Sequence, residues 1–129
     1  MILADTSVWI DHLRAGSGGL AQLLDRGAVL AHEWVIGELA LGNLRDRGEV
    51  IGLLQGLPSA APASAVEVMT LIEREGLHGL GIGYVDAQLL AATRLTPGAH
   101  LWTNDRRLAA AASRLGNAFE PAPPGEGSA

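Results

Sequence analysis

The feature that most restricts the fold is a short apolar run at the start of the chain that stops abruptly at an acid. Ile2–Ala4 is long enough for a buried strand and far too short for a signal peptide. After Asp5 come two good N-cap residues, Thr6 and Ser7, and then an apolar spacing that predicts a helix. Open α/β folds bind ligands at the carboxyl edge of their parallel strands. We therefore expect Asp5 at a ligand-binding edge.

Two later segments repeat this order of apolar strand and following helix. Ala28–Ala31 and Ala99–Trp102 are both predicted as buried strands, with helical patterns between and after them. Alternating strands and helices predict an α/β fold, in which three α/β/α layers surround a central, mostly parallel sheet. We expect one domain over residues 1–119 and a disordered tail over residues 120–129, where Pro, Gly, Ala and Glu dominate.

Two helical patterns carry expectations about burial. From Trp34 to Leu44 the sequence is apolar nearly all round, which predicts a helix buried on most faces. Ser64 and Glu67 form a capping-box pattern at the start of a later helix. That helix is expected to bury four side chains, those of Ala65, Val68, Met69 and Ile72. The Ser17–Gly19 segment is expected to break the first helix.

The charged residues and the lack of cysteine exclude several kinds of site. The 129 residues include nine arginines but no lysine and no cysteine, and the net charge is −5. Disulfides, thiolate metal sites and a phosphate-binding P-loop are therefore excluded. The negative charge argues against strong non-specific affinity for nucleic acid through the overall field. We expect a cytoplasmic protein, because no stretch is apolar enough to cross a bilayer.

Four acids stand where solvation alone does not explain them. Asp5 and Asp105 each follow a predicted strand and precede a predicted helix. Asp86 lies in the first turn of a helix, and Glu38 is the only ionisable group of its apolar segment. If the strands before Asp5 and Asp105 are neighbours, their carboxylates converge, and Asp86 can reach the same cleft.

Several carboxylates in one cleft repel one another, and a divalent cation relieves that repulsion. With only oxygen ligands on offer, the hard ions Mg²⁺ and Mn²⁺ fit far better than Zn²⁺. Such a site suits phosphodiester hydrolysis, in which the metal polarises the phosphoryl oxygen and activates water. Ser7 and Thr103 can hold carboxylates or water in place by hydrogen bonds.

Each acid also has a plainer interpretation when it is taken singly. Asp5 and Asp105 can be mere helix caps. Asp86 can be a surface acid stabilised by the helix dipole, and Glu38 can lie at an exposed rim. The four acids as a set are more specific than any one of them.

Four segments carry a resemblance to a known family, and they are Asp5–Asp11, Val35–Leu39, Gly83–Ala87 and Leu101–Asp105. They resemble the four acidic motifs of the PIN-domain ribonucleases. In length and sequence the chain is most similar to the VapC toxins of bacterial type II toxin–antitoxin pairs. The resemblance runs, in order, from Met1 to about Phe119.

This resemblance implies a PIN-like fold, Mg²⁺- or Mn²⁺-dependent endoribonuclease activity, inhibition by a VapB-type antitoxin and a homodimer. Carried over residue by residue, it implies an acidic quartet of catalytic and metal-binding residues, made up of Asp5, Glu38, Asp86 and Asp105. Ser7 and Thr103 would be the supporting hydroxyls. The alternative is a non-catalytic PIN-like module that binds protein or RNA, against which the presence of all four acids counts.

A few other residues allow two interpretations. Arg106 and Arg107 follow Asp105 and can either contact RNA phosphates or form a solvated helix face. Trp9 and Trp34 are either core residues or part of a groove for an apolar partner helix, and the first is favoured. The single histidines, His12 and His32, are expected in surface or core positions rather than in catalysis.

Overall fold

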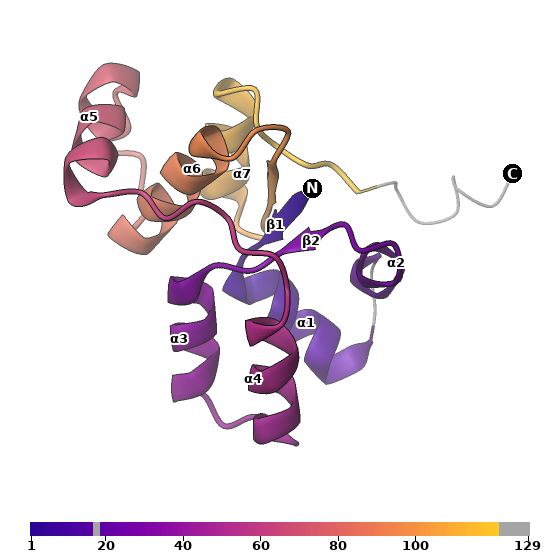
Figure 1. The fold of residues 1–129 in the computed structure, drawn as a ribbon. Helices are drawn as coiled ribbons and strands as arrows, with labels where there is room; N and C mark the ends of the chain where they lie inside the picture. The colour runs from indigo at the N-terminus through magenta and orange to yellow at the C-terminus, as the bar shows by residue number, and fades with distance from the viewer. Residues whose placement is uncertain (17–18, 122–129) are drawn as a thin grey trace, which may run out of the picture.

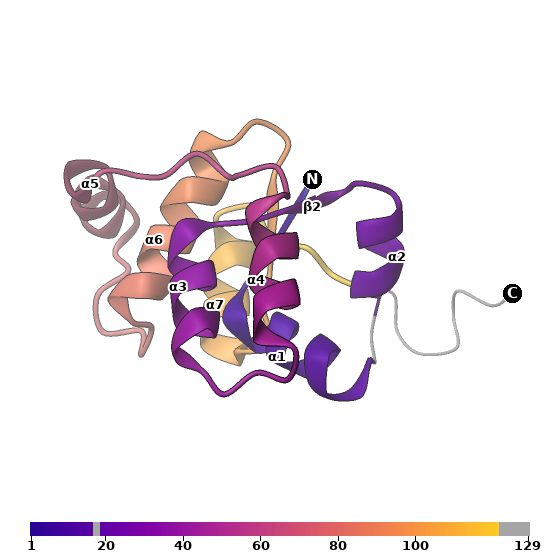
Figure 2. The same ribbon diagram turned by 60° about the horizontal axis from the view of Figure 1, so that its bottom comes forward.

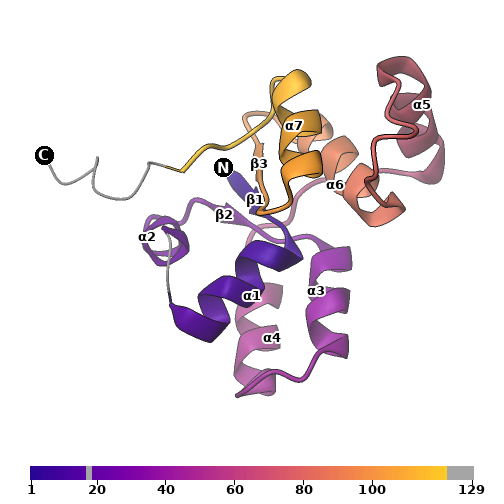
Figure 3. The ribbon, with the colours of Figure 1, turned by 180° about the vertical axis from the view of Figure 1, so that it is seen from behind.

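The computed structural model describes residues 1–16 and 19–121, shown from three sides in Figures 1, 2 and 3. Ser17 and Gly18 of the predicted helix break, and residues 122–129 of the predicted tail, lie outside the described residues. The described elements, in chain order, are β1 (Ile2–Ala4), α1 (Thr6–Ala15), α2 (Leu20–Asp25), β2 (Val29–Leu30), α3 (Glu33–Leu41), α4 (Arg47–Gln55), α5 (Ala65–Glu75), α6 (Tyr84–Leu95), β3 (His100–Trp102) and α7 (Arg106–Arg114).

The three strands form one parallel sheet in the order β2-β1-β3. The first strand is central, and its Leu3 is in register with Leu30 on one side and with Leu101 on the other. All three residues of β1 are buried, as a central strand covered on both faces requires. The predicted parallel α/β architecture is confirmed.

Helices cover both faces of this sheet. In Figures 1 and 3, α1, α3 and α4 lie on one side and α6 and α7 lie on the other, while α5 lies outside α6. Trp9 of α1 is 1% exposed and belongs to the core, as favoured from the sequence. Among the described residues, no helix is both long and apolar enough to span a membrane.

The sequence predicts that the segment from Trp34 to Leu44 forms a helix buried on most faces, and this prediction is wrong. The helix α3 ends at Leu41, and its buried residues are Val35 and Leu39. Leu41 is 91% exposed. The reason is the position of α3 in an outer layer, where it packs on α1 and α4 and leaves its remaining surface open (Figure 2).

The later helix with the capping box is also less buried than expected. The box itself is confirmed, because the backbone N–H of Glu67 donates to Ser64 Oγ and the N–H of Ser64 donates to Glu67 Oε1. Val68 is buried, but Met69 is 49% exposed and Ala65 is exposed too. The helix α5 packs on α6 through a small second core, so that one narrow side of it is covered.

Candidate active site

The carboxyl ends of β1 and β3 lie side by side, and Asp5 stands at this edge. Its backbone N–H donates to the carbonyl oxygen of Trp102 at 3.0 Å, which joins the two strand ends. Its Oδ1 accepts hydrogen bonds from the N–H of Val8 at 3.1 Å and from Ser7 Oγ at 2.5 Å. Asp5 thus caps α1, and it is 6% exposed. A carboxylate this buried is oriented by the protein rather than by water.

Asp105 occupies the corresponding place after β3. Its Oδ1 accepts from the backbone N–H groups of Arg107 at 2.8 Å and Leu108 at 3.0 Å, so it caps α7. Its own N–H donates to Thr103 Oγ1 at 3.0 Å. Both supporting hydroxyls predicted from the sequence therefore lie beside an acid. Ser7 contacts the carboxylate of its acid, whereas Thr103 contacts a backbone N–H group.

A polar network connects these two turns. The backbone N–H of Asn104 donates to Ser7 Oγ at 3.1 Å, and Asn104 Nδ2 donates to Asp11 Oδ2 at 2.8 Å. Asn104 was not singled out from the sequence, and Asp11 was noted there only as the end of a motif. One feature of the sequence could have indicated a role for Asp11: it lies one helical turn beyond Ser7, on the same side of α1.

The third acid, Asp86, lies in the first turn of α6, where its Oδ2 accepts from the N–H of Gly83 at 3.1 Å. Burial raises the pKa of the Asp86 carboxyl above its usual value, and the hydrogen bond from Gly83 opposes this shift. The negative charges of three other acids, Asp105, Asp5 and Glu38, raise the pKa further. Three of the acids chosen from the sequence thus lie near enough to affect the carboxyl of the fourth, Asp86.

The fourth acid, Glu38, comes from α3 and is exposed. Its Oε1 accepts a hydrogen bond from Thr6 Oγ1 at 2.6 Å. Thr6 is the first residue of α1 and directly follows Asp5, so this bond fastens α3 to the start of the acidic edge. Sequence reasoning noted Thr6 only as a possible cap and missed this contact.

The donor set fits a hard dication in its chemistry. Each of the four carboxylates uses one oxygen in the bonds described above, and within the described residues no hydrogen bond engages the other oxygen. Carboxylate oxygens are the ligands that Mg²⁺ and Mn²⁺ prefer. Across residues 1–16 and 19–121, no three His, Asp or Glu side chains are already gathered closely enough to hold an ion as they stand.

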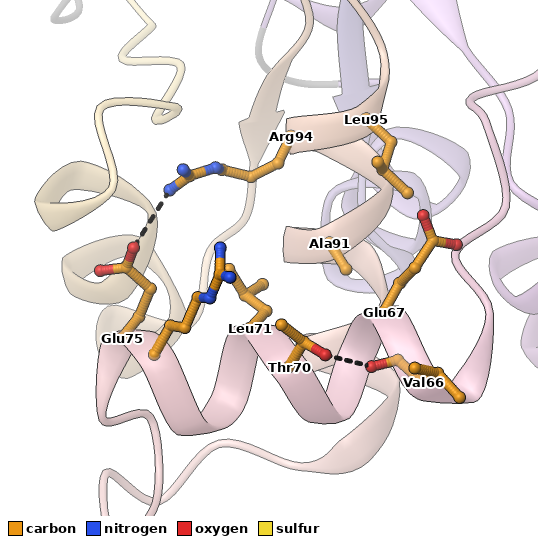
Figure 4. Close-up of a pocket in the computed structure, with 9 residues that line it drawn as sticks. Val66, Glu67, Thr70, Leu71, Glu75, Ala91, Arg94 and Leu95 are labelled. Carbon is orange, nitrogen blue, oxygen red and sulfur yellow. Dashed lines mark hydrogen bonds and ion pairs between the residues drawn. The ribbon is translucent and has the colours of Figure 1, made fainter.

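Within residues 1–16 and 19–121, none of the four acids forms an ion pair with a basic side chain. In the described part of the chain the one ion pair joins Arg94 to Glu75 at 3.6 Å, at the far end of α6 from Asp86. It borders a hollow between α5 and α6 that is distinct from the acidic edge (Figure 4). Negative charge at the acidic edge is therefore not balanced by salt bridges among these residues.

Four carboxylates lie at or near the carboxyl edge of the parallel sheet, and among the described residues none of them forms an ion pair with a base. The fold and site thus define an α/β protein with an acidic site of oxygen donors. No family model matches the chain. It is 47% identical over 119 residues, which cover 92% of its length and 96% of the relative's, to "Ribonuclease VapC32" of Mycobacterium tuberculosis. The protein of that name from a second strain matches equally well. The chain belongs to the VapC family of PIN-domain ribonucleases, and the resemblance noted in its motifs is confirmed.

Proposed function

We propose that this protein is a Mg²⁺- or Mn²⁺-dependent endoribonuclease, the toxin of a VapBC type II toxin–antitoxin system. The observation that carries the proposal is the position of Asp5 and Asp105 at adjoining strand ends, with Asp86 near enough for their charges to raise its pKa in addition to burial. Membership of a ribonuclease family supports RNA as the substrate. The charges that repel one another without the ion would become ligands with it.

In this proposal Asp5, Asp86 and Asp105 hold the cation, and Glu38 either binds it as well or positions the attacking water. The bound cation supplies charge neutralisation at the phosphodiester and lowers the pKa of water. The hydroxyl of Ser7 fixes the orientation of Asp5 through its donated hydrogen bond. That of Thr6 restrains Glu38 in the same way. Such supporting hydrogen bonds keep ligands in one orientation and so strengthen metal binding.

Two protein partners belong to the proposal, a VapB-type antitoxin and a second copy of the chain. The family supports the antitoxin. Several large apolar side chains are exposed in the single chain, and their exposure supports the presence of surfaces that other chains cover. Examples are Leu41, which is 91% exposed, Val66 at 74% and Leu53 at 53%. Light scattering of the purified chain, alone and with the antitoxin, measures both assemblies.

The central experiment is cleavage of total RNA by the purified chain with Mg²⁺, with Mn²⁺ and with EDTA. We expect cleavage with either ion and none with EDTA. Asp86→Asn should abolish it, whereas Glu73→Gln, which removes an exposed acid of α5 that makes none of the contacts described at the acidic edge, should leave it intact. An intact wild-type chain that cleaves equally well in EDTA would contradict the metal role.

Thermal melting separates this proposal from a non-catalytic binding module. A cation at ten times its dissociation constant should stabilise the fold by about 1.4 kcal/mol. That gain should disappear in Asp86→Asn and persist in Glu73→Gln. A chain that melts at the same temperature with and without both ions, and that leaves RNA uncut, would favour the binding module instead.

A further inference from the structure

An arginine lies unusually close to a glycine beside the acidic edge. A Cβ atom added to Gly81 would lie 2.7 Å from Arg107 Nη1 and 2.9 Å from Arg107 Cδ. Real Cβ atoms do not make contacts this short, so a larger residue at position 81 would displace the exposed arginine side chain from its place. Gly81 also has a φ of +79°, a conformation that other residues rarely adopt.

This contact places Arg107 against the two turns that carry Asp86 and Asp105. Its backbone N–H donates to Asp105 Oδ1, and Gly81 lies two residues before Gly83, whose N–H donates to Asp86 Oδ2. Within the described residues, no carboxylate forms an ion pair with Arg107. A guanidinium beside the loop that leads to Asp86, and outside any ion pair among the described residues, keeps its charge available for an anion.

The helix itself gains nothing from a cation at this position. Arg107 is in the first turn of α7, where the helix dipole disfavours positive charge. Its neighbour Arg106 has the same charge in the same turn but is not held against a glycine. The position of the Arg107 side chain beside Gly81, rather than its charge alone, therefore distinguishes the two arginines.

We propose that Arg107 binds a phosphate of the RNA strand next to the acidic edge, and that Gly81 leaves room for its side chain in the position that does so. The inference rests on the proposed ribonuclease function. A guanidinium can donate two parallel hydrogen bonds to phosphate oxygens, which fixes the orientation of the strand as well as attracting it. Arg107 is thus a substrate-binding residue that positions the phosphodiester for the acids.

The test measures binding of a fluorescein-labelled, single-stranded RNA of random sequence, in Mg²⁺, to chains that carry Asp86→Asn so that the RNA stays intact. Adding Arg107→Gln should weaken binding about tenfold, as expected for a hydrogen bond to a charged group. It should also lower the slope of log affinity against log salt by about 0.7, the contribution of one phosphate on a single strand. Arg106→Gln, the matched control, should change neither quantity.

The two glycines of the preceding loop provide a second control. Gly81→Ala should weaken RNA binding as Arg107→Gln does, and the double variant should lose no more than either single one. Gly79 has a similar φ of +74° with open space around it, so Gly79→Ala imposes the same backbone strain without displacing the arginine. Gly79→Ala should therefore bind RNA normally, and the melting temperatures of all variants report on folding.

Wild-type affinity and salt slope in Arg107→Gln would overturn the inference, and so would equal losses in Arg106→Gln. Cleavage of total RNA distinguishes this failure from failure of the proposed function. If the chain without Asp86→Asn cleaves RNA and Arg107→Gln cleaves it equally fast, the role of Arg107 is wrong and the ribonuclease stands. If the wild-type chain cleaves nothing with Mg²⁺ or Mn²⁺, the ribonuclease proposal fails, and the role of Arg107 in it is overturned too.

Discussion

The three strands of the sheet end in turns that look alike but differ in charge. After β1, β2 and β3, the side chains of Asp5, His32 and Asp105 each accept a hydrogen bond from a backbone N–H at the start of the next helix. In the turn after β2 this acceptor is Nδ1 of a buried histidine, which takes the N–H of Trp34 at 3.0 Å. Burial lowers the pKa of His32 and so favours its neutral form, despite opposing effects of Gln88 and Glu33.

This difference shows that capping does not require a charged group. A neutral side chain starts α3 at the same edge of the same sheet, and Asn, Ser or Thr caps helices about as well as Asp. Burial is the main cause of the raised pKa of Asp86, and the negative charges of the two acidic caps add to it. A charged cap is therefore not needed to begin a helix at this edge, and cation binding is the purpose that we propose for the charge after β1 and β3.

The largest expected effect separates capping from charge. Asp5→Asn and Asp105→Asn keep a capping oxygen, so the stability of the fold should change by less than about 1 kcal/mol. Cleavage of RNA should fall at least about 100-fold, beyond the usual cost of losing a residue that only supports a ligand. His32→Asn is the control, because it changes the uncharged cap of the neighbouring turn without removing a carboxylate and should leave cleavage unchanged. If both Asp variants cleave RNA as fast as the wild type does, the acids are caps and nothing more.

A smaller effect should distinguish the two hydroxyls. Ser7 donates to the Asp5 carboxylate and accepts from the N–H of Asn104, whereas Thr103 accepts only from the backbone N–H of Asp105. Ser7→Ala should raise the Mg²⁺ concentration for half-maximal cleavage about 10- to 100-fold. Thr103→Val should raise it less than about tenfold, because the exposed N–H left behind can bond to water. The reverse order in a magnesium titration would contradict this ranking.

Much of the acidic edge could be predicted because its signals are local. An apolar run followed by an acid and a cap defines each strand–helix turn, and this pattern identified Asp5 and Asp105. Their convergence depends on which strands pair, and β1 pairs with β3 across about three quarters of the chain. Contacts such as Thr6 to Glu38 and Asn104 to Asp11 likewise join residues that no local pattern relates.

The burial of the outer helices could not be predicted for a related reason. An apolar composition indicates that a helix buries some of its side chains. How many it buries depends on how many other elements pack against it, which local sequence does not show. The helix α3 contacts α1 and α4, and α5 contacts α6, so Leu41 and Met69 remain exposed. In a chain that belongs to a toxin family, such exposed apolar side chains also agree with the proposed partner chains.

The smallest expected effect concerns the histidine turn. Because the folded-state pKa of His32 lies below the unfolded value of about 6.5, the unfolded chain takes up a proton first as the pH falls. Stability contributed by neutral His32 is therefore fully present above pH about 6.5 and is lost as the pH drops towards the lowered pKa. The loss has a slope of at most about 1.4 kcal/mol per pH unit for one proton.

Urea unfolding at pH 7.5 and 5.5 measures this loss. Between these two pH values the free energy of unfolding should fall more for the wild type than for His32→Asn, which caps α3 without titrating. An equal fall in the free energy of unfolding for the two proteins would mean that other titrating groups account for the pH dependence. His32 would then contribute nothing measurable to it.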